Sequence, residues 1–249
     1  MPDSVTASPD LTVPHLSEPQ RVVDTFVAPS KTFTDILRKA TFWGPLLILI
    51  LVAVGFSYCV QQKVGWDKVF ENNLHQTPTR EEQFEKLPAD QQATQKTIGV
   101  KITEIVTYCY PVLILVFTAI FTLLVWVTAN FIFGGSAKFS QVFAVNMYAN
   151  LVMNIKYLLA IVALFAGVAP DSFLIQNPVG TNIAYYWTDA PKWLAALCQH
   201  IDIFEIWSVL LTTLGVSIVA KVSRGKAAAA VIGWWLIFVL VGVGFAAAS

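Results

Sequence analysis

Five long apolar stretches constrain the fold of this chain more than any other feature of its sequence. They cover residues 43–60, 110–133, 142–168, 201–220 and 227–247. Each is close to the ~20 residues that a helix needs to cross a hydrocarbon layer of about 30 Å. Lipid offers no partner for backbone N–H and C=O groups, so such segments must be helical. The sequence therefore predicts an all-α polytopic transmembrane bundle of five helices, with short interfacial helices.

The composition also indicates an integral membrane protein. The chain is 56% hydrophobic and only 13% charged, whereas a soluble domain carries about 25% charged residues. Its formal net charge is zero and its Lys and Arg residues form no dense patch, so no nucleic-acid partner is predicted. The predicted partners are membrane lipid, other proteins or further copies of the chain.

The polar segments divide the chain into three parts. Residues 1–16 hold three prolines and little to bury, which predicts a disordered tail without a cleavable signal peptide. Residues 17–42 are predicted to form cytoplasmic amphipathic helices. Residues 43–249 form the predicted five-span domain, with an outer helical loop at about residues 61–109. Pro78 and Pro88 each suit a first helical turn, which predicts short surface helices in that loop.

Basic residues set the expected orientation, because Lys and Arg gather on the cytoplasmic side of membrane proteins. They cluster before the first stretch, between the second and third, and between the fourth and fifth. These residues are Arg21, Lys31, Arg38, Lys39, Lys138, Lys221, Arg224 and Lys226. The predicted N-terminus is therefore cytoplasmic and the predicted C-terminus lies outside.

Two short helices are predicted before the first span. Ser17 and Gln20 have the spacing of a capping box, and Pro29 ends that run. Thr32 and Asp35 repeat the capping spacing. The second helix then has an apolar stripe of Phe33, Ile36, Leu37 and Ala40, and a basic face of Lys31, Arg38 and Lys39. This pattern predicts a membrane-interface helix with its stripe toward acyl chains. It would serve as a topology anchor or as a docking or lipid-sensing helix.

Lys156 interrupts the third stretch, where a cation costs at least ~2.5 kcal/mol on insertion scales. We expect it to be buried in protein, with Asp202 or Glu205 of the fourth stretch as its partner. The alternatives are an ion or proton pathway, a structural pair, or a lysine that reaches the interface. Asn146, Asn150 and Asn154 recur every four residues, a pattern that more often joins helices than binds solutes.

The last stretch contains small residues four apart, at Gly242 and Ala246 and at Gly244 and Ala248. Such pairs allow close helix packing, which we expect within the bundle rather than in a dimer. No enzyme motif is found, and His15, His75 and His200 lack metal-ligand spacing. The sequence therefore predicts no catalytic site, no metal and no cofactor.

Three segments resemble the Yip1 domain family of membrane proteins. They are "VVDTFVAPSKTFTDILRKATFWGPLL", "FGGSAKFSQVFAVNMYANL" and the stretch from "WLAALCQHIDIFEIW" through the final hairpin, with Asp202, Phe204 and Trp207. The resemblance implies five spans. The eukaryotic branch binds prenylated small GTPases in vesicle traffic, but its acidic Tyr-Gly-Pro motif is replaced here by "FWGPLL". The resemblance therefore favours the bacterial branch and implies a location in a bacterial cytoplasmic (inner) membrane.

The resemblance and the residues together favour a non-enzymatic membrane-organising or partner-binding protein. The alternative is a small transporter or channel component that uses Lys156 as an intramembrane charge. A membrane enzyme is the third hypothesis and has the least support.

Overall fold

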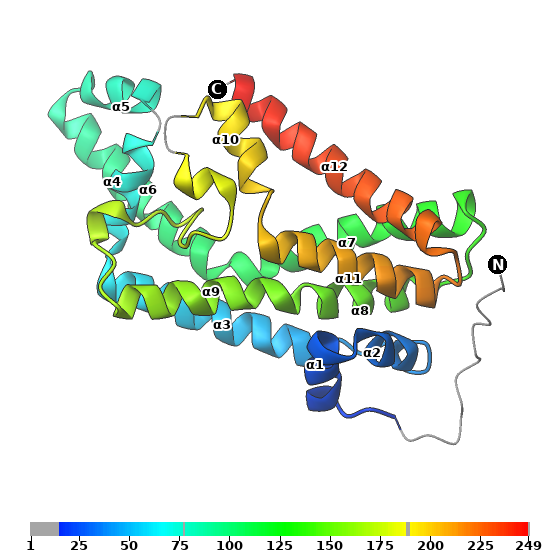
Figure 1. Cartoon of the computed structure of the whole chain (residues 1–249). Helices are drawn as coiled ribbons and strands as arrows, with labels where there is room; N and C mark the ends of the chain where they lie inside the picture. Colours follow the sequence, from blue (N-terminus) through cyan, green and yellow to red (C-terminus); the bar gives the residue numbers. More distant parts are fainter. Residues whose placement is uncertain (1–14, 77, 188–189, 249) are drawn as a thin grey trace. The chain divides into compact units, whose positions relative to one another are not determined.

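A computed structural model describes residues 15–76, 78–187 and 190–248 of the 249-residue chain. Residues 1–14, which make up most of the predicted disordered tail, lie outside the described residues. The regular secondary structure of the described residues is helical and includes no strand, which confirms the all-α part of the predicted fold class (Figure 1).

Twelve α-helices, a π-helical turn and two short 3₁₀ turns follow one another in the described ranges. Those of the first half are α1 Glu18–Val27, α2 Pro29–Ile36, α3 Trp43–Lys63, α4 Trp66–His75, α5 Pro78–Glu85, α6 Ala89–Tyr108 and α7 Tyr110–Val127. The π-helical turn η1 Thr128–Ile132 continues α7. The rest are α8 Phe139–Ala149, α9 Leu151–Phe165, η2 Pro170–Ser172, η3 Ile183–Tyr186, α10 Lys192–Gln199, α11 Ile203–Val219 and α12 Arg224–Ala248.

Four segments are long and apolar enough to cross a membrane: Trp43–Lys63, Tyr110–Ile132, Phe139–Phe165 and Arg224–Ala248. The fourth predicted span corresponds to α11, which is apolar but has only 17 residues. At ~1.5 Å per residue it is about 25 Å long, which is at the short end for a hydrocarbon layer of about 30 Å. The membrane-spanning character is therefore shown by four helices, and five crossings stay a prediction.

The chain divides into two compact units. The first consists of Met1–Ile48, Leu115–Asn154 and Thr181–Ser249, and the second of Leu49–Ile114 and Ile155–Gly180. The boundaries fall inside α3, α7 and α9. Each unit is described by itself.

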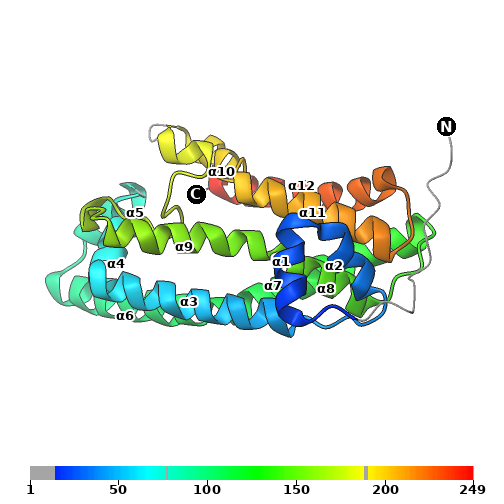
Figure 2. The same ribbon diagram turned by 60° about the horizontal axis from the view of Figure 1, so that its bottom comes forward.

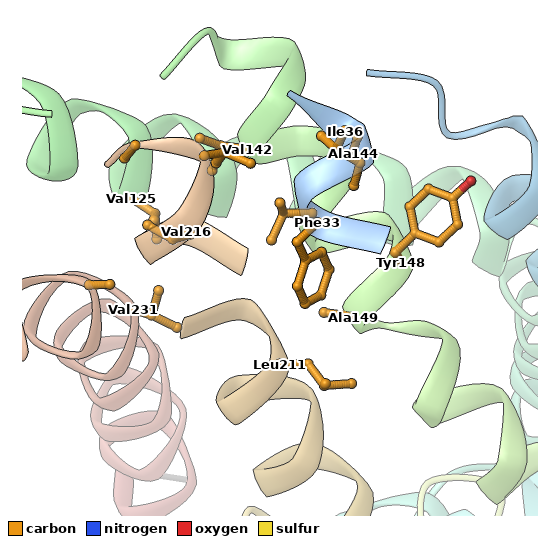
Figure 3. Packing of buried hydrophobic residues seen from close by; sticks show 14 of the residues in the cluster. Phe33, Ile36, Val125, Val142, Ala144, Tyr148, Ala149, Leu211, Val216 and Val231 are labelled. Carbon is orange, nitrogen blue, oxygen red and sulfur yellow. The ribbon is translucent and has the colours of Figure 1, made fainter. Parts of the chain in front are cut away.

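The core of the first unit is built from α2, α8, α11 and α12. Phe33 and Ile36 of α2 are fully buried there, beside Val145 of α8 and Val216 of α11. Figure 3 shows the Phe33 ring between these helices, near Ala149 and Leu211. A Cβ atom on Gly215 would lie 2.4 Å from Cγ1 of Val145. This glycine therefore lets α11 approach α8 closely.

The second unit contains the outer loop predicted from the sequence. Pro78 begins α5 and Pro88 caps α6, as expected, but α6 has 20 residues and is not a short surface helix. It packs against α4, where a Cβ on Gly99 would lie 2.2 Å from the Phe70 ring. The amide of Asn72 donates to the carbonyls of Pro170 and Phe173, at 2.7 and 2.9 Å, which fixes the loop after α9 onto α4.

The small residues of α12 do not pack as predicted. Among the described residues, no atom lies within 4 Å of a Cβ built on Gly242 or Gly244. The expectation of close contact within the bundle is therefore wrong for these two glycines, since the second half of α12 turns many of its side chains outward.

Candidate functional site

The most elaborate polar arrangement in the first unit joins α1 and α2 through a buried ion pair. The Arg21 side chain is 1% exposed and that of Asp35 is 6% exposed. Nη2 and Nε of Arg21 donate to Oδ2 of Asp35 at 2.6 and 2.8 Å. A buried charge is tolerated only when it is paired and hydrogen-bonded, and both conditions are met here.

The backbone and hydroxyl groups around Arg21 complete its surroundings. Its Nη1 donates to the Thr41 hydroxyl at 2.6 Å. Its carbonyl accepts hydrogen bonds from Thr25 at 2.7 Å and from Thr32 at 3.0 Å. On the other side of the pair, the backbone N–H of Leu16 donates to Asp35 at 3.3 Å. The pair therefore ties together the segment before α1, both short helices and the segment before α3.

Glu18 extends this arrangement to α8 and to the first turn of α3. It accepts hydrogen bonds from Thr41, from the Gly44 N–H at 3.0 Å and from the Tyr148 hydroxyl at 2.7 Å. Burial raises the pKa of Glu18, but the hydrogen bonds from Thr41, Tyr148 and Gly44, together with the Arg21 charge, lower it to a net value below its ordinary one. Figure 3 shows the Tyr148 hydroxyl directed away from the Phe33 ring.

The structure corrects the reading of the second amphipathic helix. Phe33 and Ile36 do not face acyl chains, because both are fully buried against α8 and α11. Figure 2 shows α2 beside these two helices. Leu37 is half-buried, Arg38 lies 3.9 Å from Asp35, and Lys39 is exposed. Thr32 and Asp35 do not cap a helix, because α2 begins earlier, at Pro29. The position of α2 relative to a bilayer stays a prediction.

A second polar group lies at the start of α11. Asp202 is 1% exposed and caps this helix by accepting from the N–H groups of Phe204 and Glu205, at 2.9 and 3.3 Å. The Thr181 hydroxyl donates to its other oxygen at 2.5 Å. Asp202 therefore sets the point at which α11 begins, since its oxygens satisfy backbone groups that the helix leaves open.

Glu205 lies one turn further along and bridges two elements. Its Oε1 is 2.8 Å from Nδ1 of His200 and accepts a 2.7 Å hydrogen bond from the indole of Trp235. Trp235 is the twelfth of the 25 residues of α12. The Glu205 carboxylate therefore lies level with the middle of an apolar helix, where ionisable groups most often mark a functional site.

The asparagine stripe makes contacts within the first unit. The Asn146 amide donates to the Thr122 hydroxyl of α7 at 2.9 Å, and the Ser208 hydroxyl of α11 donates to Asn150 at 2.8 Å. Asn154 donates to the carbonyl of Leu151 in its own helix, at a longer 3.4 Å. Two of the three asparagines thus connect different helices.

Lys156 belongs to the second unit and is buried, with 9% of its surface exposed. Its predicted partners Asp202 and Glu205 belong to the first unit. The predicted pairing therefore stays a prediction.

Sequence reasoning missed the Arg21 network, and it also missed His200 and Trp235 as partners of Glu205. Arg21 was counted only as a basic residue on the cytoplasmic side. One local signal was present, since Glu18 and Arg21 are three residues apart and so share a helix face. Among the described residues, no group of three or more His, Cys, Asp or Glu side chains could hold a metal ion.

Taken with the four long apolar helices, this architecture defines an all-helical integral membrane protein. The chain matches the Yip1 domain over residues 23–246, which is nearly its whole length. It therefore belongs to the Yip1 domain family. Comparisons with curated proteins and with solved structures gave no match.

Proposed function

We propose that this protein is a non-enzymatic membrane-organising or partner-binding protein whose docking surface is the module formed by α1 and α2. The observation that carries this proposal is the buried network of Arg21, Asp35 and Glu18, which holds both helices on the bundle. A helix that only lies on the membrane surface does not require a buried ion pair that fixes it to the bundle. A surface that binds a partner gains affinity when it is rigid before binding.

The outward face of α1 supports the same proposal. Val23 and Val27 are one helical turn apart and are 58% and 74% exposed. The buried face of this helix instead carries Arg21 and Thr25. An exposed apolar pair on the outside of a helix that is held in place by its other faces suits contact with another protein, with a second copy of the chain or with lipid.

A photo-crosslinking residue at position 27 tests the proposal in native membranes, with position 39 as the control because Lys39 is exposed on the segment that follows α2. We expect a discrete crosslinked protein at position 27 and its loss in an Arg21→Met background. Crosslinks to lipid alone would reduce the module to an anchor. Crosslinks to the same chain would identify a homo-oligomer as the bound species.

We further propose five crossings, with the N-terminus cytoplasmic and the C-terminus outside, in a bacterial cytoplasmic membrane. The basic residues on the predicted inner side support this orientation. A reporter fused after residue 249 distinguishes the cases, because four crossings would return the C-terminus to the side of the N-terminus.

The alternative function is a small transporter or channel component. It is favoured by the position of Glu205 beside the middle of α12 and by the burial of Lys156. Proteoliposomes that contain a pH-sensitive dye test it. A proton flux that is lost in Glu205→Gln and in Lys156→Gln would support this alternative, and an unchanged baseline leak with the wild-type protein would contradict it.

A further inference from the structure

The turn between α11 and α12 carries a backbone feature that needs an explanation. Lys221 has a φ of 55°, and it is the only non-glycine residue with positive φ in the described ranges. This conformation is unfavourable for an L-residue with a Cβ atom, and glycine is the usual residue where a helix ends in this way. Strained backbone conformations cluster at functional sites, so the side chain of Lys221 is a candidate for a functional role.

Hydrogen bonds hold Lys221 in place from both sides. The N–H of Lys221 donates to the Ile218 carbonyl at 3.4 Å, and the N–H of Val222 donates to the Ser217 carbonyl at 3.2 Å. This pair of bonds is the Schellman arrangement that closes a helix. On the α12 side, the Ser223 hydroxyl accepts from the N–H of Lys226 at 3.4 Å.

A second segment brings more basic residues to the same end of the unit. The Ser136 N–H donates to the Ala220 carbonyl at 3.0 Å, which fixes the loop after η1 against the turn. The Lys226 ammonium donates to the Phe133 carbonyl at 3.2 Å. Lys138, the N-cap residue before α8, lies two residues after Ser136 and is exposed, as are Lys221, Arg224 and Lys226.

No acidic side chain on these segments offsets the four positive charges. The sequence has no Asp or Glu from residue 105 to residue 170, or from residue 206 to its end. Beside the basic turn, Phe131 and Ile132 of η1 are 74% and 69% exposed. Cationic groups next to exposed apolar side chains at the end of membrane helices match a lipid with an anionic headgroup and acyl chains.

We propose that Lys221, Lys226, Arg224 and Lys138 form a binding site for the phosphate of an anionic phospholipid, with Phe131 and Ile132 against its acyl chains. The Lys226 ammonium is already oriented by Phe133 and keeps two further N–H donors for phosphate oxygens. The charge complementarity of this surface explains why a side chain is kept at position 221 despite the strain. The proposal does not depend on the docking role of α1 and α2 or on the number of crossings.

Native mass spectrometry of the full chain in detergent, titrated with phosphatidylglycerol or phosphatidylcholine, tests the site. We expect the wild type to bind phosphatidylglycerol more tightly than phosphatidylcholine. The Lys221→Gln/Lys226→Gln variant should lose about tenfold in phosphatidylglycerol affinity, with phosphatidylcholine binding unchanged. The control Lys63→Gln/Lys86→Gln removes two positive charges from the second unit and should bind like the wild type.

Lys221→Gly separates charge from backbone strain, since it should raise the unfolding temperature and still weaken phosphatidylglycerol binding. Wild-type affinity in the Lys221→Gln/Lys226→Gln variant would overturn the proposal. Equal losses in the control variant would also overturn it, because the effect would then be one of net charge. Inorganic phosphate that displaces the lipid at equal concentration would show a phosphate site rather than a lipid site.

Discussion

Replacement of Arg21 tests whether the buried network fixes the α1–α2 module. In Arg21→Met the Asp35 carboxylate, 6% exposed, would lose the two donors that now lie at 2.6 and 2.8 Å. Among the described residues, it would keep the Leu16 N–H and the His15 ring, both at 3.3 Å, and Arg38 at 3.9 Å. Removal of one member of a buried pair costs about 3–5 kcal/mol, and these remaining contacts place the expected loss near the lower value.

The unfolding temperature in detergent, followed by the fluorescence of the eight tryptophans, reports this loss. A change of 1 kcal/mol shifts the midpoint by about 2–4 °C in a protein of 150–250 residues. We therefore expect Arg21→Met to unfold on the order of 10 °C below the wild type. Lys39→Met, which removes an exposed charge from the segment that follows α2, should stay within about 0.5 kcal/mol of the wild type.

The double variant Arg21→Met/Asp35→Leu gives the sharper comparison. It removes the uncompensated carboxylate, and replacement of a whole buried pair by apolar residues is often close to neutral. The double variant should therefore be more stable than Arg21→Met alone, with a coupling energy of about 2–3 kcal/mol. A double variant less stable than Arg21→Met, or an Arg21→Met protein as stable as the wild type, would refute the argument.

Three further outcomes are expected. Gly215→Ala should destabilise the protein by about 1–2 kcal/mol, because overpacking against Val145 outweighs the gain in helix propensity. The control is Gly233→Ala, where a new Cβ would have no described neighbour within 4 Å; it should be neutral or stabilising by up to about 1 kcal/mol. Equal unfolding temperatures for the two variants would contradict the close approach of α11 to α8. The Glu18 carboxyl has a pKa below its ordinary value of 4.5 in the folded protein, so its stabilisation is present above pH 4.5 and is lost as pH falls through the lower folded value. The gap in unfolding temperature between wild type and Glu18→Gln should therefore narrow from pH 7 toward pH 3.5, and a constant gap would count against the predicted linkage. Gly99→Leu should loosen α4 from α6, because the Phe70 ring occupies the space of the new side chain, and faster proteolysis of the outer segment would report it.

Local signals in the sequence are sufficient to predict where most of the helices begin and end. The predicted cap at Ser17 is present, with its hydroxyl accepting from the Gln20 N–H at 3.4 Å, and Pro19 lies in the first turn of α1. The last apolar stretch, predicted over residues 227–247, is contained within α12. These features depend on neighbours in the chain, so propensity and hydropathy suffice to predict them.

Partners far apart in the chain could not be predicted in this way. Asp35 lies 14 residues after Arg21, and Tyr148 lies 130 residues after Glu18. Because the charged partner is supplied by another helix, α1 buries Arg21 completely and leaves Val23 and Val27 outside, while Val22 and Phe26 are only partly buried. Hydropathy alone would bury the four apolar residues and expose the arginine. The prediction that Phe33 and Ile36 face acyl chains was wrong for a related reason, because an apolar stripe on a helix can be covered either by protein or by lipid.

The arrangement around α11 bears directly on the number of crossings. Asp202 begins this helix after a break at residues 200–202, and α10 and α11 both pack against α12. Figures 1 and 2 show α10 near the C-terminal end of α12, whereas Glu205 at the start of α11 reaches Trp235 near its middle. The 17-residue α11 therefore packs along only the first part of α12, and α10 packs along the part of α12 nearer its C-terminus. If the five crossings that we propose are made, the fourth would consist of two helices, α10 and the 17-residue α11, with a polar break between them.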